Sequence, residues 1–216
     1  MRNILKANGI EPSSERRKRT TWRQFLSANW DCLAAADFFT VEVCTWRGLA
    51  TYYVLLVMEL STRRVHVAGI TRAPNAAWMK QTARNLADVE DGLLLGKRFL
   101  IIDRDTKYGE AFQHLLAAAG VEPLPLPPRS PNLNAFAERF VRSIKEECHG
   151  RLILFSEGSL RHAITQYVEH YHEERPHQGV GNRPLELAIP GSPPAESAQC
   201  RERLGGFLRS YHGIAA

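Results

Sequence analysis

KRFLIIDRDTKYGEAFQHLLAAAGVEPLPL, residues 97–126, contains the order of elements that decides the fold. Its first seven residues, 97–103, form an apolar run that predicts a buried strand. Residues 109–120 have the spacing of a helix that ends at Gly120, and residues 121–126 predict a second short strand. A strand, a helix and a strand in succession favour two parallel strands joined by a crossover.

The chain before this stretch predicts three more strands, at residues 32–43, 50–60 and 63–71, each rich in β-branched or aromatic residues. Their short separators suit an antiparallel meander. Helices are expected near Trp22 to Trp30 and over residues 75–90. We therefore expect an α/β fold with a five-stranded mixed sheet, in which three antiparallel strands are followed by two parallel strands, and with helices on both faces.

The remaining sequence predicts a helix up to about residue 149 and another over residues 157–174, and then a segment of low packing density beyond Pro184. The expected domain organisation has three parts. A basic linker occupies residues 1–21, a core domain occupies residues 22–190, and a C-terminal extension occupies residues 191–216.

The composition, with 44% hydrophobic and 24% charged residues among 216, is typical of a globular protein. No apolar run approaches the roughly 20 residues that span a bilayer, and the start of the chain lacks an apolar signal sequence. We therefore expect a cytoplasmic protein without a membrane partner. The net charge is +5, and residues 1–20 supply most of the surplus. This tail can bind phosphates or serve as a solvated linker.

The cysteines and histidines do not predict a zinc site. The four cysteines are far apart and form no CxxC pair, which also argues against a disulfide framework. His170 and His172 are two residues apart, so on a helix they point to different faces. We interpret this region as a helix end followed by a structured loop that contains His177.

Two aspartates lie on or directly after predicted strands. Asp37 lies within an apolar strand, where a buried carboxylate needs a partner or a cation, although the strand's solvated face would hold it equally well. Asp103 ends the strand at residues 97–103, and strand ends in open α/β sheets are where ligand groups gather. They are also where aspartates begin turns, and Asp105 competes with Asp103 for the same role.

Glu138 begins the next helix, after a loop of prolines and asparagines. It lies within two turns of any start between Ser130 and Asn134. Alone, it would suit a surface ion pair with Arg142 at i,i+4, which contributes a few tenths of a kcal/mol.

Asp37, Asp103 and Glu138 can converge at one edge of the sheet. Three nearby carboxylates repel one another unless a divalent cation neutralises them. Hard oxygen ligands select Mg²⁺ or Mn²⁺, and a pair of such ions supports phosphoryl transfer. These three residues are therefore the candidate catalytic and metal-binding residues.

Four segments together resemble the catalytic core of the DDE transposase and retroviral-type integrase superfamily, and within it the prokaryotic insertion-sequence transposases with an integrase core. They are ADFFTV around Asp37, LIIDRDTKYG around Asp103, PPRSPNLNAFAERFVRSIKEE around Glu138, and YHEERPHQGVGNRPLE at residues 171–186. The resemblance covers roughly residues 20–190. Many members have Asn-Gly after the second aspartate, where this chain has Arg104 and Asp105, and full-length members usually carry an N-terminal helix-turn-helix.

The resemblance implies a ribonuclease H-like fold and a metal-binding acidic triad at the three matching positions. The implied activity is Mg²⁺-dependent nicking at a DNA element end, with two Mg²⁺ ions or with Mn²⁺ in their place, followed by attack of the freed 3′ hydroxyl on target DNA. The implied partners are DNA ends, target DNA and further copies of the chain in a homo-oligomer, with no small-molecule substrate.

Basic and amide side chains near the triad can hold the DNA backbone without reading sequence, or can lie on a solvated face. The candidate DNA-binding residues are Arg104, Lys107, Asn132, Asn134, Arg139, Arg142, Lys145, Arg175 and His177. Two other functions remain open. One is a catalytically idle, truncated remnant that regulates by binding DNA or a full-length transposase, and the other is a structure-selective nuclease with the ribonuclease H-like fold.

Overall fold

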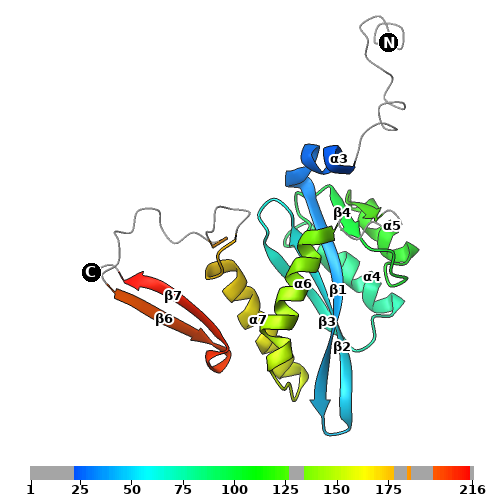
Figure 1. Cartoon of the computed structure of the whole chain (residues 1–216). Helices are drawn as coiled ribbons and strands as arrows, with labels where there is room; N and C mark the ends of the chain where they lie inside the picture. Colours follow the sequence, from blue (N-terminus) through cyan, green and yellow to red (C-terminus); the bar gives the residue numbers. More distant parts are fainter. Residues whose placement is uncertain (1–21, 127–133, 178–183, 186–196, 215–216) are drawn as a thin grey trace, which may run out of the picture.

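A five-stranded mixed sheet forms the centre of the computed structural model, which describes residues 22–126, 134–177, 184–185 and 197–214 (Figure 1). Its strands, in the spatial order β3-β2-β1-β4-β5, are β1 (Leu33–Thr45), β2 (Gly48–Glu59), β3 (Val65–Thr71), β4 (Phe99–Ile102) and β5 (Glu122–Pro125). β2 pairs antiparallel with β1 and β3, whereas β4 pairs parallel with β1 and β5. The predicted topology of three antiparallel strands followed by two parallel strands is therefore confirmed.

The alternation of side chains along β1 explains why both faces of the sheet are covered. Successive residues of a strand point to opposite faces. Phe39 and Val41 are buried in one hydrophobic cluster, and Ala34 and Ala36 are buried in the other. Because each face is apolar, each needs a layer of helices to exclude water.

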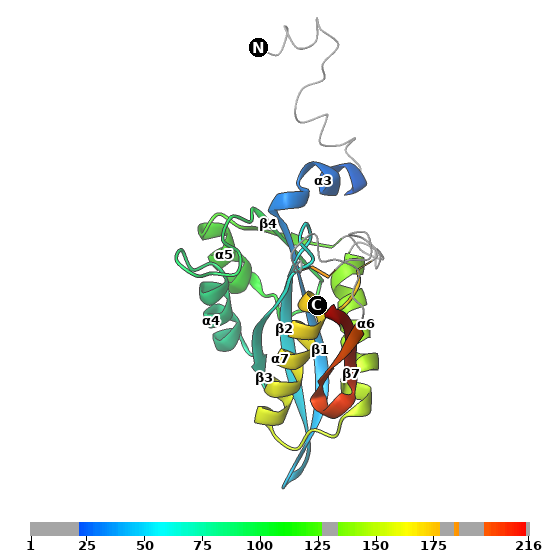
Figure 2. The same ribbon diagram turned by 90° about the vertical axis from the view of Figure 1, so that its left-hand side faces the viewer.

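The helices form a layer on each face (Figures 1 and 2). α4 (Ala76–Leu86) and α5 (Glu110–Ala118) cover one face, and α6 (Ala135–Glu147) and α7 (Glu157–Glu173) cover the other. The short elements are α3 (Trp22–Ala28), η1 (Trp30–Cys32) and η3 (His149–Arg151). No helix in the described part of the chain is long and apolar enough to cross a membrane.

Local signals in the sequence set where these helices begin and end. The side chain of Asn75 caps α4 by accepting a hydrogen bond from the backbone N–H of Trp78 at 2.9 Å. Ser156 and Ser159 form reciprocal capping bonds at the start of α7. Gly120 has a φ of +86°, the left-handed conformation that suits glycine after a helix, so the predicted end of this helix is confirmed.

Aromatic packing between α6 and α7 fixes the position of α6 over the sheet. Phe140 is fully buried, and its ring contacts Tyr171 edge-on at a centroid distance of 4.8 Å and Tyr167 at 5.8 Å. Ala137 and Ile144 of the same helix are also fully buried. Since these residues share one side of α6, Glu138 is placed at the edge of the buried stripe rather than within it.

A β-hairpin follows the core, made of β6 (Ser197–Arg203) and β7 (Leu208–Ile214) with η5 (Leu204–Gly206) between them. It lies beside α7 in both views (Figures 1 and 2). Leu208 is buried in the hydrophobic cluster that includes α6 and α7, and Arg203 forms ion pairs with Glu169, Glu173 and Glu174 of α7 and its C-terminal end. The sequence analysis expected only a segment of low packing density here and did not predict this hairpin.

Candidate functional site

The parallel pairing of β1 with β4 brings two aspartates together at one edge of the sheet. Ala35 pairs with Ile101 in the register of these strands. Asp37 comes two positions after Ala35, and Asp103 comes two positions after Ile101. Both aspartates therefore point to the face of the sheet that carries Ala35 and Ile101. That face belongs to the hydrophobic cluster that contains α6 and α7. The two aspartates therefore approach the face from which Glu138 comes.

The first turn of α6 is attached to β1 directly beside Asp37. Asn134, the residue before α6, does not cap the helix with its side chain. Its side-chain Nδ2 instead donates a hydrogen bond to the backbone oxygen of Ala36 at 3.3 Å, and the residue is 4% exposed. Glu138 is half-buried in the first turn that follows.

The charges of Asp103 and Glu138 both act on the carboxylate of Asp37. Burial, together with the negative charges of Asp103 and Glu138, raises the pKa of Asp37 from 3.8 to about 7, against the lowering effects of the Phe38 backbone N–H and Lys145. Burial also raises the pKa of Asp103. Of the two aspartates, Asp37 has the more strongly raised pKa, and burial is the largest cause.

The surroundings of Asp103 and Asp105, the two candidates for the second acidic residue of the site, differ in the structure. Lys107 forms an ion pair with the carboxylate of Asp105, and although burial would raise the pKa of Asp105, the hydrogen bond from Lys107 lowers it overall. Asp103 accepts only a backbone N–H, that of Asp105, at 3.0 Å. Asp105 is therefore neutralised by its own lysine, and Asp103 is the aspartate whose charge acts on Asp37.

The donor set fits a hard divalent cation by its chemistry. It contains three carboxylates, and the side-chain Oδ1 of Asn134 is a buried oxygen without a hydrogen-bond partner. Within the described ranges, however, no group of three or more His, Cys, Asp or Glu side chains has the arrangement that would hold a metal ion. The carboxylates thus lie within electrostatic range of one another, but they do not surround a common metal-binding position.

Several of the predicted DNA-contact residues are held by bonds within the chain. Arg104 donates through Nε to the backbone oxygen of Leu126 at 2.8 Å, and Lys107 is paired with Asp105 as described above. Arg175 forms an ion pair with Glu147. These side chains are anchored, so any contact that they make with DNA would use their remaining donors.

The other predicted contact residues differ in exposure. Arg139, Arg142 and Lys145 are exposed on α6, whereas Asn134 is buried and bonded to β1. Asn132 lies outside the described residues. The i,i+4 ion pairs of the described helices are Glu157–Arg161 and His170–Glu174, so the surface pair of Glu138 with Arg142 that the sequence allowed is not formed.

The three histidines near the end of α7 have separate partners. His170 bonds to Glu174 at 2.8 Å, and His177 bonds to the backbone oxygen of Tyr171 at 2.8 Å. The ring Nε2 of His172 accepts the backbone N–H of Val65 at 2.9 Å. All four cysteines are free, and Cys200 is exposed.

Two residues near these elements were missed by the sequence analysis. Arg63, in the turn between β2 and β3, and Tyr171, on α7, line a pocket together with Arg139 and Arg175. Arg63 has a φ of +64°, which is uncommon for a residue other than glycine. The sequence offers no signal for this conformation, because Arg63 and Arg64 look alike as turn residues.

Comparison with known proteins agrees with this geometry. The mixed sheet with its helices on both faces is the ribonuclease H-like fold. Residues 119–184 match the family model described as "Integrase core domain". This segment, about a third of the chain, is therefore similar to an integrase core. No curated protein matches the sequence.

Two solved structures illustrate the similarity. A chain of the simian T-cell lymphotropic virus intasome, in its complex with the PP2A regulatory subunit B56 gamma, has a TM-score of 0.50 and 11% identity. The match covers 98% of this chain and 86% of that one. The catalytic core domain of BIV integrase has a TM-score of 0.48 and 14% identity, with 72% of this chain and 91% of that one covered. At 11% identity, the similarity to the intasome chain supports the fold of this protein and nothing about its activity.

Proposed function

We propose that this chain is a polynucleotidyl transferase that nicks DNA ends and transfers the freed strand to target DNA, and that Asp37, Asp103 and Glu138 hold its metal ions. The observation that carries the proposal is the register of β1 and β4, which brings Asp37 and Asp103 to one edge of the sheet, and the raised pKa of Asp37 agrees with it. Carboxylates within electrostatic range of one another destabilise the folded chain unless a cation compensates them.

The chemistry of the donors selects the cofactor. Carboxylate oxygens favour Mg²⁺, with Mn²⁺ as a substitute, over softer transition metals. When bound, two such ions would stabilise the charge that develops on the attacking and leaving oxygens of a phosphodiester. The protein's own contribution is to hold Asp37 on β1, Asp103 directly after the adjacent β4, and Glu138 on a helix that Asn134 attaches to β1.

The basic side of α6 would align the DNA. Arg142 and Lys145 follow Glu138 at i+4 and i+7, so they lie on the same side of the helix. Both are exposed, and the positive charge of Lys145 acts on Asp37. A strand whose phosphate lies at the triad could therefore be held by these two cations through its neighbouring phosphates. We propose that the chain does so as a homo-oligomer on paired DNA ends, in the cytoplasm.

The test is a plasmid-nicking and strand-transfer assay in Mg²⁺ and in Mn²⁺, with wild type, Glu138→Gln and Glu146→Gln. Glu146 is an exposed glutamate of the same helix, so its variant matches the loss of charge outside the triad. We expect Glu138→Gln to keep its fold by circular dichroism and to lose at least 100-fold in rate, with Glu146→Gln close to wild type.

Three outcomes would change the proposal. Full activity of Glu138→Gln would refute the site assignment. A wild-type chain that binds DNA and nicks nothing in either metal would indicate the regulatory remnant instead. Cleavage restricted to branched or otherwise structured DNA, with no joining of strands, would indicate the structure-selective nuclease.

A further inference from the structure

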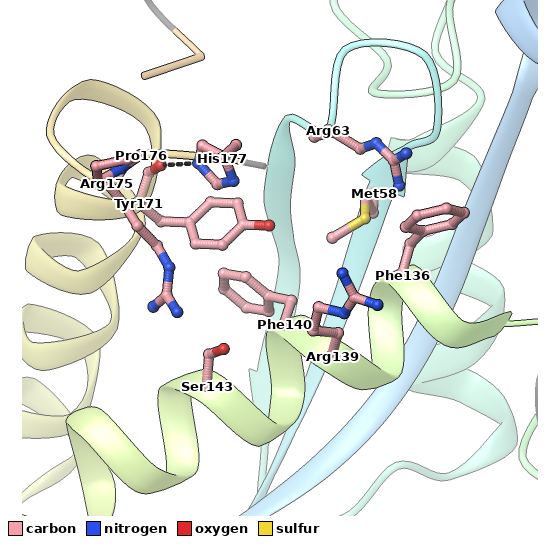
Figure 3. Close-up of a pocket in the computed structure, with 10 residues that line it drawn as sticks. All are labelled: Met58, Arg63, Phe136, Arg139, Phe140, Ser143, Tyr171, Arg175, Pro176 and His177. Atoms are coloured by element: carbon pink, nitrogen blue, oxygen red, sulfur yellow. Dashed lines mark hydrogen bonds between the residues drawn. The ribbon is translucent and has the colours of Figure 1, made fainter. Parts of the chain in front are cut away.

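A pocket of about 260 Å³ lies between α6, the end of α7 and the turn that follows β2 (Figure 3). Phe136, Arg139 and Phe140 of α6 form one wall. At 100° per residue, this wall is turned by 100° to 160° around the helix axis from Glu138. The pocket therefore opens on a different side of α6 from the proposed catalytic site.

Three guanidinium groups line this pocket, and two of them lack an acidic partner. Arg175 is neutralised by Glu147. No carboxylate in the described part of the chain lies within ion-pair distance of Arg63 or Arg139. Burial lowers the pKa of Arg63, and the positive charge of Arg139 lowers it further, against an opposing effect from Tyr171. Two neighbouring guanidinium groups that lack an acidic partner are stabilised when an anion binds between them.

The turn that presents Arg63 is strained, and it is held in place from two directions. The φ of +64° costs an ordinary residue of the order of 1 kcal/mol. The backbone N–H of Arg63 donates to the oxygen of Glu59 at 2.9 Å, and its guanidinium carbon lies 3.4 Å from the ring centroid of Phe136. The guanidinium is thus positioned before any ligand arrives, which lowers the entropic cost of binding one.

Tyr171 adds a neutral donor between the cations. The charges of Arg175, Arg63 and Arg139 all act on its hydroxyl, so the phenol lies near all three. Figure 3 shows the hydroxyl directed toward the side of the pocket where Arg63 and Arg139 lie. The ring of Tyr171 is held edge-on between Phe140 and His177, at centroid distances of 4.8 and 4.5 Å.

We propose that this pocket binds a backbone phosphate of DNA, with the attached deoxyribose against the apolar part of the lining. The planar forks of two unpaired arginines and a phenol match the oxygens of a phosphate better than the two oxygens of a carboxylate. The volume exceeds what one phosphate group needs, and the apolar part of the lining suits a sugar. Because the pocket lies on another side of α6 from Glu138, the phosphate is not the one that reacts.

This inference rests on the proposed function only in that the ligand is DNA, and it extends the expected contacts of Arg139 and Arg175 by adding Arg63 and Tyr171. It implies that the chain grips DNA at a second point, away from the metal-binding carboxylates. Such a contact fixes the direction in which a strand leaves the catalytic site. It carries no sequence information, in keeping with guanidinium contacts to phosphate.

The experiment measures binding of a fluorescent DNA duplex by anisotropy at several NaCl concentrations, in EDTA, so that no cleavage chemistry is involved. The variants are Arg63→Gln and Arg139→Gln, and the control is Arg161→Gln. Arg161 is an exposed arginine of α7 that pairs with Glu157. We expect each pocket variant to bind about 5- to 20-fold more weakly and to lose about one unit of the salt slope. The control should stay within about twofold.

Thermal unfolding of each variant shows whether it is folded, and Arg139→Gln tests the pocket even if Arg63→Gln fails to fold. A second arm adds inorganic phosphate alone and measures the shift in melting temperature of wild type and both variants. Unchanged DNA affinity and salt slope in folded variants would overturn the proposal, whether or not free phosphate binds. A wild-type chain that never nicks DNA but loses affinity in both variants would leave this site standing and remove the proposed catalytic function.

Discussion

Asn134 donates its side-chain amide to the backbone oxygen of Ala36 across 3.3 Å, which attaches the first turn of α6 to the strand that carries Asp37. The side chain of an asparagine before a helix ordinarily caps that helix. The side chain of Asn134 does not cap α6 and bonds instead to Ala36 of β1, 98 residues earlier in the sequence. The bond thus attaches the start of the helix that carries Glu138 to the strand that carries Asp37.

Replacing Asn134 with alanine should therefore affect metal binding more than folding. Losing this bond should cost about 1 to 2 kcal/mol of unfolding free energy. We expect nicking to slow by at least tenfold, and the Mg²⁺ concentration for half-maximal rate to rise, because Glu138 is no longer held. Asn85→Ala, on the exposed side of α4, is the matched control. A purely structural role would lower stability and leave the Mg²⁺ dependence unchanged.

The stability of the metal-free protein should depend on the ionisation of Asp37. Its folded pKa is about 7 against an ordinary value of 3.8, so the stability it contributes is present below pH 3.8 and is lost as the pH rises through 7. Asp37→Asn removes this loss. We expect the variant to be more stable than wild type at pH 8 in EDTA by about 2 to 4 kcal/mol, with the difference shrinking toward pH 4.

Urea unfolding at a series of pH values measures this difference. Adding Mg²⁺ at pH 8 should stabilise wild type and leave Asp37→Asn nearly unchanged, because a bound cation compensates the carboxylates. A difference between the two proteins that is constant from pH 4 to pH 8 would show that Asp37 ionises normally, and it would remove the main support for the metal site.

Glu174 should control the docking of the hairpin. It accepts hydrogen bonds from Arg203 Nε and Ser210 Oγ, each at 2.8 Å, and it bonds to His170. Burial would raise its pKa, but these bonds lower it to about 2. The stability that Glu174 contributes is therefore present above about pH 4.5 and is lost as the pH falls toward 2.

Glu174→Gln should release the hairpin at neutral pH without unfolding the sheet. Hydrogen exchange would show faster exchange in residues 199–210 and unchanged protection in β1 and β2. Glu202→Gln, which removes an exposed pair with Arg209, should leave the hairpin protected. Equal protection of the hairpin in the two variants would mean that the buried apolar contact of Leu208 is sufficient to dock it.

Gly69 of β3 is required by close packing rather than by backbone conformation. A Cβ at this position would lie 2.6 Å from Cζ2 of Trp78. We expect Gly69→Ala to lower the unfolding free energy by about 1 to 3 kcal/mol, since the indole must shift within a packed layer. Gly158→Ala, where a Cβ would meet only Ser156 Oγ at 3.6 Å, should be neutral or stabilising. Thermal or urea unfolding distinguishes the two outcomes.

The sequence by itself determined the elements and their order, because periodicity and turn residues are local properties. The strand at residues 97–103, the helix ending at Gly120 and the strand after it were all predicted, and with the meander before them they left few topologies open. The sequence also singled out Asp37, Asp103 and Glu138, because the three can converge at one edge of the sheet and match the acidic triad of the family that the chain resembles. Their role as metal ligands stays a prediction.

Only the tertiary structure decided which of these residues act on one another. The register between β1 and β4, a contact between elements distant in sequence, brings Asp103 toward Asp37, and Lys107 forms an ion pair with the competing aspartate, Asp105. The docking of β6 and β7 on α7 likewise depends on long-range packing. So does the presence of Arg63 and Arg139 in the same pocket. These contacts cannot be predicted from local sequence patterns. They depend on which faces of the helices and strands pack together when both sides of the sheet are buried.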